Sequence, residues 1–249
     1  MHANRASFLF LLALSLLSWL CLPSVAEAQP LRDEADQILM YFEATEKVKE
    51  SLQNSLGMVT VRTKIQPGML DGIHNVLKGV GTLAKCRDRT LVFFPAAIAE
   101  SAVSASIQFS GKKPLTLDIL GSPKEFPIAV GVLPSLPEEI TPLPIWRGEK
   151  EIDKGLVLTG IAERGPKILS KVYIVETPKP PLERFRITNI RVPDGSPMVT
   201  HDLNILAIPV RDWGTQGLSL AVHASTLRKV CDEKLTVEPI QMKSLEINP

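Results

Sequence analysis

The stretch LGSPKEFPIAV, residues 120–130, shows the pattern that governs most of this chain. It ends one short apolar run, Leu115 to Leu120, and begins another, Pro127 to Leu133, with glycine, serine, proline and charged residues between them. Runs of the same kind continue on both sides: Met58 to Val61, Thr90 to Phe94, Ser104 to Phe109, Leu156 to Ile161, Lys171 to Glu176, Phe185 to Val192, Leu203 to Val210 and Leu218 to Val222. Many short apolar runs separated by such turns predict an all-β domain.

The runs fall into two sets with a proline-rich stretch between them. Prolines 134, 137, 142 and 144 make this stretch typical of a linker. We therefore expect a first barrel at about 57–133, a linker at 134–145 and a second barrel at about 146–224. Helical spacing of apolar residues predicts an amphipathic lead-in over 29–56, with Ile38 and Val48 on its apolar side. A short C-terminal helix is expected over 225–235, followed by a tail, 236–249.

The first 28 residues have the three parts of a secretory signal peptide. His2 and Arg5 supply a weakly basic start, Phe8 to Leu22 is almost wholly apolar, and Ala26-Glu27-Ala28 is a small-x-small cleavage signal. The apolar part is shorter than the roughly 20 residues that a transmembrane helix needs. We expect export to the periplasm or the exterior, cleavage after Ala28 and no stable membrane span.

Charge and cysteine content exclude several classes of function. The chain has 28 basic and 27 acidic residues, which is not the basic excess of a nucleic-acid-binding protein. After the signal peptide only Cys86 and Cys231 remain, and their wide separation does not fit a zinc site. In an oxidising compartment they either pair in one disulfide or stay as buried free thiols, and the sequence leaves both open.

Each candidate motif for a cofactor, a metal or catalysis lacks a feature that the function requires. Gly79 to Ala84 has the spacing of a dinucleotide-binding loop, but a strand-like run follows where a helix is required. Asp71 and His74 are spaced for one helical turn and have no third ligand nearby. His201-Asp202 is interpreted as a hairpin turn, and His223 as a surface or strand-edge residue. We expect no cofactor and no metal.

The segments, taken together in chain order, resemble the trypsin-like fold and specifically the HtrA (DegP-like) family of exported serine proteases. The segment Leu120 to Val130 is similar, without a gap, to the family's Gly-Ser-Asp-Pro-x-x-Asp-Ile-Ala-Val. Gly79 to Leu83 resembles the Gly-x-Gly start of the first barrel. The other similar segments are Leu91 to Ile98, Ser106 to Lys112, Pro193 to Val199 and Gln216 to His223. The resemblance covers about 45–235 and implies a double six-stranded β-barrel with short terminal helices. Because the chain stops soon after the last helix, we expect none of the PDZ domains that such proteases often carry.

The same resemblance implies that the catalytic positions are degenerate. Ala96 stands where the family has its catalytic histidine, and Pro127 where it has the aspartate. In the register that best fits the next strand Gly195 replaces the serine, whereas a shift by one position retains Ser196. Because the serine needs a histidine base, and the histidine a carboxylate, neither Ala96 nor Pro127 can perform its task. The favoured register also places Pro193, which has no N–H, at the oxyanion-hole glycine.

From these residues we expect a non-catalytic protease homologue that acts through protein contacts. Its partner would be a protein or an extended peptide in the cleft between the barrels. Assembly into a homo-oligomer or with an active protease relative is equally compatible, since the family commonly trimerises through its N-terminal segment. The alternatives are a residual serine endopeptidase that uses Ser196, with His74 and Asp118 as replacement partners, and a purely structural exported β domain.

Overall fold

The computed structural model describes residues 54–63, 75–124, 126–148, 154–159, 167–176, 185–188, 192–200, 202–213 and 217–239. All of them belong to one compact unit, Lys47–Pro249. The expected signal peptide and nearly all of the expected lead-in, 29–56, lie outside the described residues. Asp71, His74 and His201 lie outside them as well.

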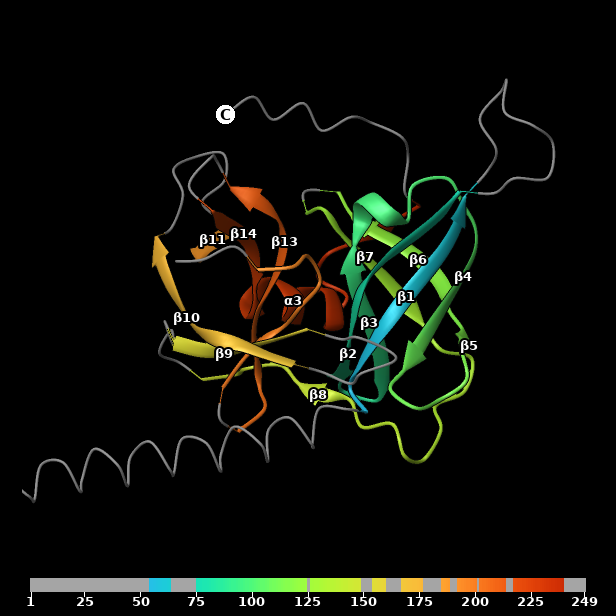
Figure 1. Cartoon of the computed structure of the whole chain (residues 1–249), viewed down its shortest axis with the longest axis horizontal. Helices are drawn as coiled ribbons and strands as arrows, with labels where there is room; N and C mark the ends of the chain where they lie inside the picture. Colours follow the sequence, from blue (N-terminus) through green and yellow to red (C-terminus); the bar gives the residue numbers. More distant parts are fainter. Residues whose placement is uncertain are drawn as a thin grey trace, which may run out of the picture. The chain divides into compact units, whose positions relative to one another are not determined.

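The first sheet contains nine strands, and most of them come from the first half of the chain (Figure 1). They are β1 (Leu56–Thr63), β2 (Val76–Cys86), β3 (Arg89–Pro95), β4 (Ala102–Phe109), β5 (Leu115–Thr116), β6 (Asp118–Pro123), β7 (Ile128–Val132), β8 (Leu143–Pro144) and β15 (Val237–Glu238). Their order is β15-β6-β7-β3-β2-β1-β4-β5, and β8 pairs with β2 in parallel. Short connections join the antiparallel neighbours β2 and β3, β4 and β5, and β6 and β7, whereas β1–β4, β3–β7 and β6–β15 pair strands that are not consecutive in the chain.

Leu117 explains how this sheet curls into a barrel. The sequence predicted one strand from Leu115 to Leu120, but β5 and β6 are separated at Leu117. β5 pairs with β4 and β6 pairs with β7, so the two halves of one extended segment lie on opposite sides of the sheet order, with β5 at one end and β6 next to β15 at the other. The Leu117 N–H donates to the Ala105 carbonyl at 3.0 Å. The chain therefore passes at Leu117 from pairing with β4 to pairing with β7, which brings the two sides of the sheet together.

Alternating burial identifies the inner face of the first barrel. Val59, Val61 and Ile107 are fully buried, while their neighbours in β1 and β4 are largely more exposed. The core cluster also contains residues from β2, β3 and β7: Leu83, Val92, Phe94 and Ala129. This period-two burial is the pattern expected when one face of each strand packs on a core.

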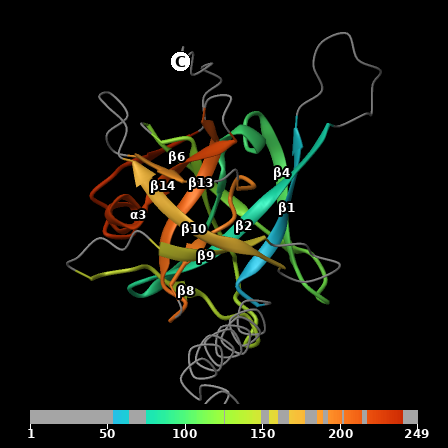
Figure 2. The ribbon, with the colours of Figure 1, turned by 60° about the vertical axis from the view of Figure 1, so that its left-hand side comes forward.

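The second sheet is a closed barrel of six strands. They are β9 (Lys154–Thr159), β10 (Lys167–Glu176), β11 (Phe185–Thr188), β12 (Met198–Val199), β13 (Ile205–Trp213) and β14 (Leu218–His223), in the order β10-β11-β14-β13-β12-β9. β9 pairs with β10 and completes the closure. Figure 2 brings this barrel forward, with β9 and β10 crossing the view. Its core includes Met198, Leu206 and Ala221.

The described residues contain one α-helix, α3 (Ala224–Cys231), which directly follows β14. It ends four residues before the expected end at Leu235, because Glu233 adopts a left-handed φ of 58° that a helix cannot continue. His223 was expected at the surface, and this is wrong: it is only 5% exposed and caps α3 by accepting from the Ser225 N–H. No helix in the described part of the chain is both long and apolar enough to cross a membrane.

Three connections join segments that are distant in the sequence. Cys86 at the end of β2 forms a disulfide with Cys231 at the end of α3, across 145 positions. β15, from the segment expected to be a tail, pairs with β6. Its carbonyl at Glu238 lies against Gly121, where φ is +138° and a Cβ would come within 2.0 Å of that oxygen. The C-terminal segment thus packs on the first barrel.

We predict that the disulfide contributes strongly to stability because it restricts the unfolded chain across a long loop. Cys86→Ser is expected to lower the free energy of unfolding by about 2–5 kcal/mol, measured by urea denaturation under oxidising conditions. Cys231→Ser should have the same effect, and the double variant should be no less stable than either single one. Full additivity of the two substitutions would contradict a bond between these sulfurs.

Candidate functional site

Ala96 and Pro127 lie side by side where two strands of the first barrel meet. β3 ends at Pro95 and a short 3₁₀ helix, η1 (Ala96–Ile98), follows it. Pro95 pairs with Ile128, the first residue of β7. The Ala96 N–H donates to the Pro127 carbonyl at 3.1 Å, which holds the two positions together. A methyl group and a proline ring therefore occupy this corner, and neither can accept a proton.

Ser122 holds the loop that presents Pro127. Its hydroxyl lies 2.9 Å from the Phe126 carbonyl oxygen and 2.8 Å from that of Ile128, and it donates its one proton to this pair of acceptors. The Phe126 N–H donates to the Pro123 carbonyl, closing a tight turn. These hydrogen bonds explain why the sequence LGSPKEFPIAV forms a β-hairpin loop at Pro127, the position where the resemblance places the family's aspartate.

Gly195 lies in a turn that no larger residue fits. Its φ is +83°, and a Cβ built there would come within 2.1 Å of the Val80 carbonyl oxygen and 2.9 Å of Pro95 Cδ. The structure thus brings Gly195 against the residue that precedes Ala96, so all three predicted triad positions lie in one region. Their equivalence to a protease triad remains a prediction from the resemblance.

The backbone donors of the Gly195 turn are used inside the fold. The Gly195 N–H donates to the Pro209 carbonyl in β13 at 2.7 Å, and the Ser196 N–H donates to the Pro193 carbonyl at 3.1 Å. An oxyanion hole requires N–H groups that point at the substrate. Pro193 has no N–H, so none of these three residues offers a free donor.

Thr82 anchors the same turn from the other barrel. Its buried hydroxyl donates to the Gly195 carbonyl at 2.9 Å across 113 positions in the sequence. Sequence reasoning missed Thr82 because a single threonine within the glycine-rich strand β2 carries no motif. The hydrogen bond joins β2 of the first barrel to the turn before β12 of the second.

Ser196 is placed where a substrate does not reach it. Its side chain is 0% exposed, and its hydroxyl has no hydrogen-bond partner among the described residues. An activated serine needs a base within hydrogen-bond reach and access to the substrate. The candidate partner Asp118 is exposed in β6, and His74 lies outside the described residues. His223 Nδ1 lies 3.0 Å from Ser225 Oγ, at the start of α3.

A pocket of about 470 Å³ lies beside the Gly195 turn. Residues of both barrels line it, and most of them are apolar or glycine: Met58, Gly79, Val80, Pro95, Ala97, Ile98, Val192 and Pro193, with Lys78 and Asp194 as the charged members. The described part of the chain contains no group of three or more potential metal ligands. The pocket therefore offers a mainly apolar surface next to the Gly195 turn.

No protein-family model matches this chain, and no curated protein matches it. Among solved structures it is similar to an HtrA-type protease, AlgW, determined with a decapeptide. The two share 13% sequence identity with a TM-score of 0.57, over 75% of this chain and 66%, just under two thirds, of the AlgW chain. The prediction of fold class is confirmed: this chain has the trypsin-like double β-barrel fold of HtrA-type proteases.

Proposed function

We propose that this protein is an exported, non-catalytic HtrA-like protease homologue that binds an extended segment of another protein. The observation that carries the proposal is the Gly195 turn, whose N–H groups are used internally while an apolar pocket stays open beside it. Extended peptides bind such sites by main-chain pairing and by placing side chains in pockets. The AlgW structure contains a decapeptide, which supports a peptide as the class of ligand.

We propose that catalysis is lost because no residue at these positions supplies a base, an orienting carboxylate or an accessible nucleophile. Ala96 and Pro127 supply no base and no orienting carboxylate, and Ser196 is fully buried. Even an intact oxyanion hole without a triad retains only about 10³–10⁴-fold acceleration over water. Here the Gly195 and Ser196 N–H groups donate to Pro209 and Pro193, so this contribution is also missing.

We predict that the purified mature protein cleaves neither casein nor fluorogenic peptides above the buffer background. Ser196→Ala should leave this result unchanged, and a fluorophosphonate probe should not label Ser196. Cleavage that Ser196→Ala abolishes would instead establish the residual endopeptidase.

Restoring the triad residues should not restore cleavage, because the turn has no room for a serine. The variant Ala96→His, Pro127→Asp, Gly195→Ser is expected to stay inactive in the same fluorogenic assay. Gly195→Ser alone should lower the free energy of unfolding by about 1–3 kcal/mol more than Gly111→Ser. Gly111 is the matched control, since its φ of +68° is also left-handed but a Cβ there meets nothing within 4 Å. Equal destabilisation by the two substitutions would contradict the steric argument.

We predict that an unfolded protein chain binds at the apolar pocket. Ala97 is exposed and lines the pocket, so Ala97→Glu places a charge there without disturbing the core. It should weaken binding of fluorescently labelled, reduced casein by tenfold or more in an anisotropy titration. Leu136→Glu is the control, because Leu136 is also exposed, at 40%, and does not line this pocket. No binding by the unchanged protein would favour a purely structural β domain.

Export follows from the signal-peptide pattern and is part of the same proposal. Cleavage after Ala28 would make Gln29 the first residue of the mature protein. An oxidising compartment outside the cytoplasm also suits the Cys86–Cys231 disulfide.

A further inference from the structure

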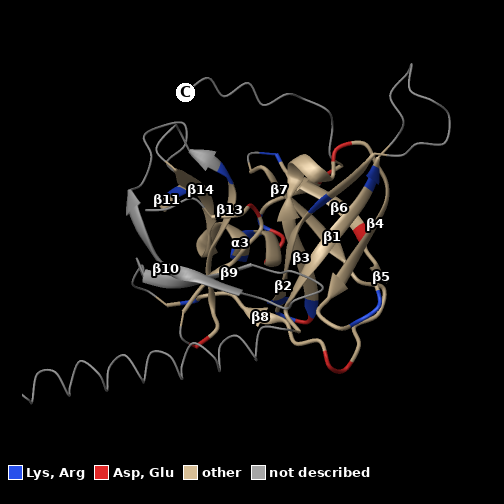
Figure 3. Ribbon diagram, in the orientation of Figure 1, with Lys and Arg blue, Asp and Glu red and all other residues tan. Residues whose placement is uncertain are grey.

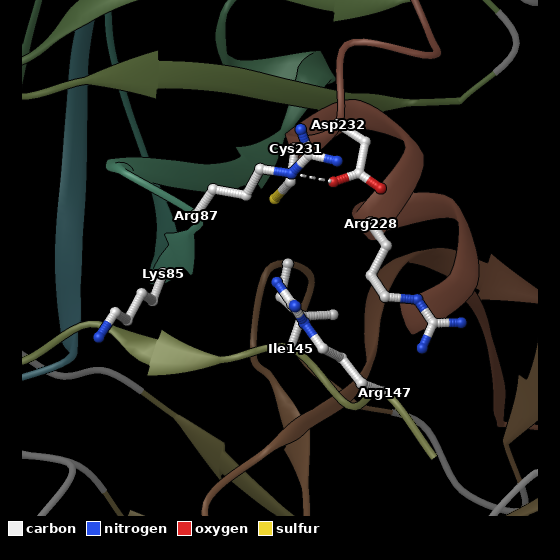
Figure 4. A pocket seen from close by; sticks show the side chains of 7 residues that line it. All are labelled: Lys85, Arg87, Ile145, Arg147, Arg228, Cys231 and Asp232. Atoms are coloured by element: carbon white, nitrogen blue, oxygen red, sulfur yellow. Dashed lines mark ion pairs between the residues drawn. The ribbon is translucent and has the colours of Figure 1, made fainter. Parts of the chain in front are cut away.

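A second pocket, of about 230 Å³, gathers positive charge from three separate parts of the chain (Figure 4). Lys85 and Arg87 come from the end of β2, Arg147 from the segment after β8, and Arg228 from α3. Asp232 is the one carboxylate in its lining, and Ile145 and the disulfide-bonded Cys231 complete it. Four cationic residues thus line one hollow together with a single carboxylate. In Figure 4 the Arg147 guanidinium is turned toward the hollow, whereas the charged ends of Lys85 and Arg228 extend away from it.

The charges in this pocket are only partly matched. Arg87 Nε lies 2.9 Å from Asp232 Oδ1, and this pair is the dashed line in Figure 4. Lys85, Arg147 and Arg228 form no ion pair with any described residue. Basic and acidic residues are interspersed over the other described strands (Figure 3).

The pocket is held in shape by contacts between its three parts. The Cys86–Cys231 disulfide joins the end of β2 to the end of α3. Arg228 Nη1 donates to the Trp146 carbonyl at 2.7 Å, and the Trp146 N–H donates to the Ile205 carbonyl at 3.0 Å. This hydrogen bond fixes the position of Arg228 at the side of the pocket. A site assembled in advance loses less conformational entropy when the ligand binds.

Like charges brought together repel one another unless an anion lies between them. Guanidinium groups are planar forks of N–H donors that match the oxygens of phosphate and sulfate. A lining with four cationic residues and one carboxylate carries a net positive charge, which favours a doubly charged anion over a singly charged carboxylate. The volume also exceeds the roughly 10–15 Å³ that one water needs by the same measure, so a tetrahedral oxyanion and the first atoms of an ester group fit.

We propose that this pocket binds a doubly charged tetrahedral oxyanion, phosphate or sulfate, either free or as an ester of a small molecule. Arg147 supplies the guanidinium that is turned toward the hollow, and Lys85, Arg87 and Arg228 add to the positive charge around it. The site is separate from the pocket beside Gly195, and it does not depend on the proposed peptide binding.

The test is a calorimetric titration of the oxidised mature protein with inorganic phosphate and with sulfate at low ionic strength. We expect saturable binding to one site, at least tenfold weaker with acetate, and weakening as sodium chloride is added. Arg147→Gln should weaken phosphate binding by tenfold or more. The control Lys112→Gln removes the same charge near Glu139 in the first barrel and should have no effect. Melting curves of both variants report whether the fold is intact.

Two further arms identify the source of the oxyanion. Tighter binding of glucose 6-phosphate than of inorganic phosphate would assign the pocket to esters, and the reverse order would assign it to the free ion. Lys85→Gln provides a second variant, expected to weaken binding in the same way as Arg147→Gln. Absence of saturable binding with all of these anions, or equal loss in Lys112→Gln and Arg147→Gln, would overturn the proposal.

Discussion

The fit of Gly195 between the two barrels is the constraint on which the site depends. Its left-handed φ and the 2.1 Å approach of a hypothetical Cβ to the Val80 oxygen leave room for glycine alone. Thr82 donates to the carbonyl of Gly195 from one barrel, and Pro209 accepts from its N–H in the other. The turn is thereby a structural joint between β2 and β13.

These contacts give a physical reason for the proposed loss of protease chemistry in a trypsin-like fold. In the trypsin-like template the turn before the second barrel's hairpin must present a hydroxyl and free N–H groups to the substrate. Here the same backbone groups stabilise the packing of the barrels, and Ala96 and Pro127, which carry no acidic or basic group, lie beside each other. The apolar pocket beside the turn does not depend on those groups, so a binding role is compatible with the loss. Fold alone does not establish function, and the chemistry of this corner is therefore the stronger guide.

The disulfide has a second consequence beyond stability. It joins the end of β2, with Lys85 and Arg87, to the end of α3, with Arg228 and Asp232. Without such a connection the repulsion between these cations would favour their separation. The covalent bond and the Arg228 contact with Trp146 hold them around one hollow instead. The net charge of the whole chain is only +1, so it does not reveal that positive charge is concentrated at this pocket.

Strand positions were predictable where the residue pattern alone determines them. Nearly every apolar run expected in the sequence contains a strand, because burying one face of a sheet requires apolar residues at a period of two. β2 was not among those runs, since Gly79 and Gly81 interrupt its apolar residues. Those glycines are explained only by packing: a Cβ at Gly81 would come within 2.5 Å of Val59 in the neighbouring strand. The two-residue strands β12 and β15 are too short to produce any pattern.

Some features of the site were likewise predictable from the sequence, and others depended on the tertiary structure. The sequence by itself determined the all-β class, the two cysteines available for a disulfide, and the absence of a base at Ala96 and of a carboxylate at Pro127, because these follow from residue type and local spacing. Only the tertiary structure decided the burial of Ser196 and His223, the use of the turn's N–H groups by Pro209 and Pro193, and the grouping of Lys85, Arg147 and Arg228. The physical reason is that burial, hydrogen-bond partners and local charge depend on residues far apart in the chain, which meet only when both barrels have closed.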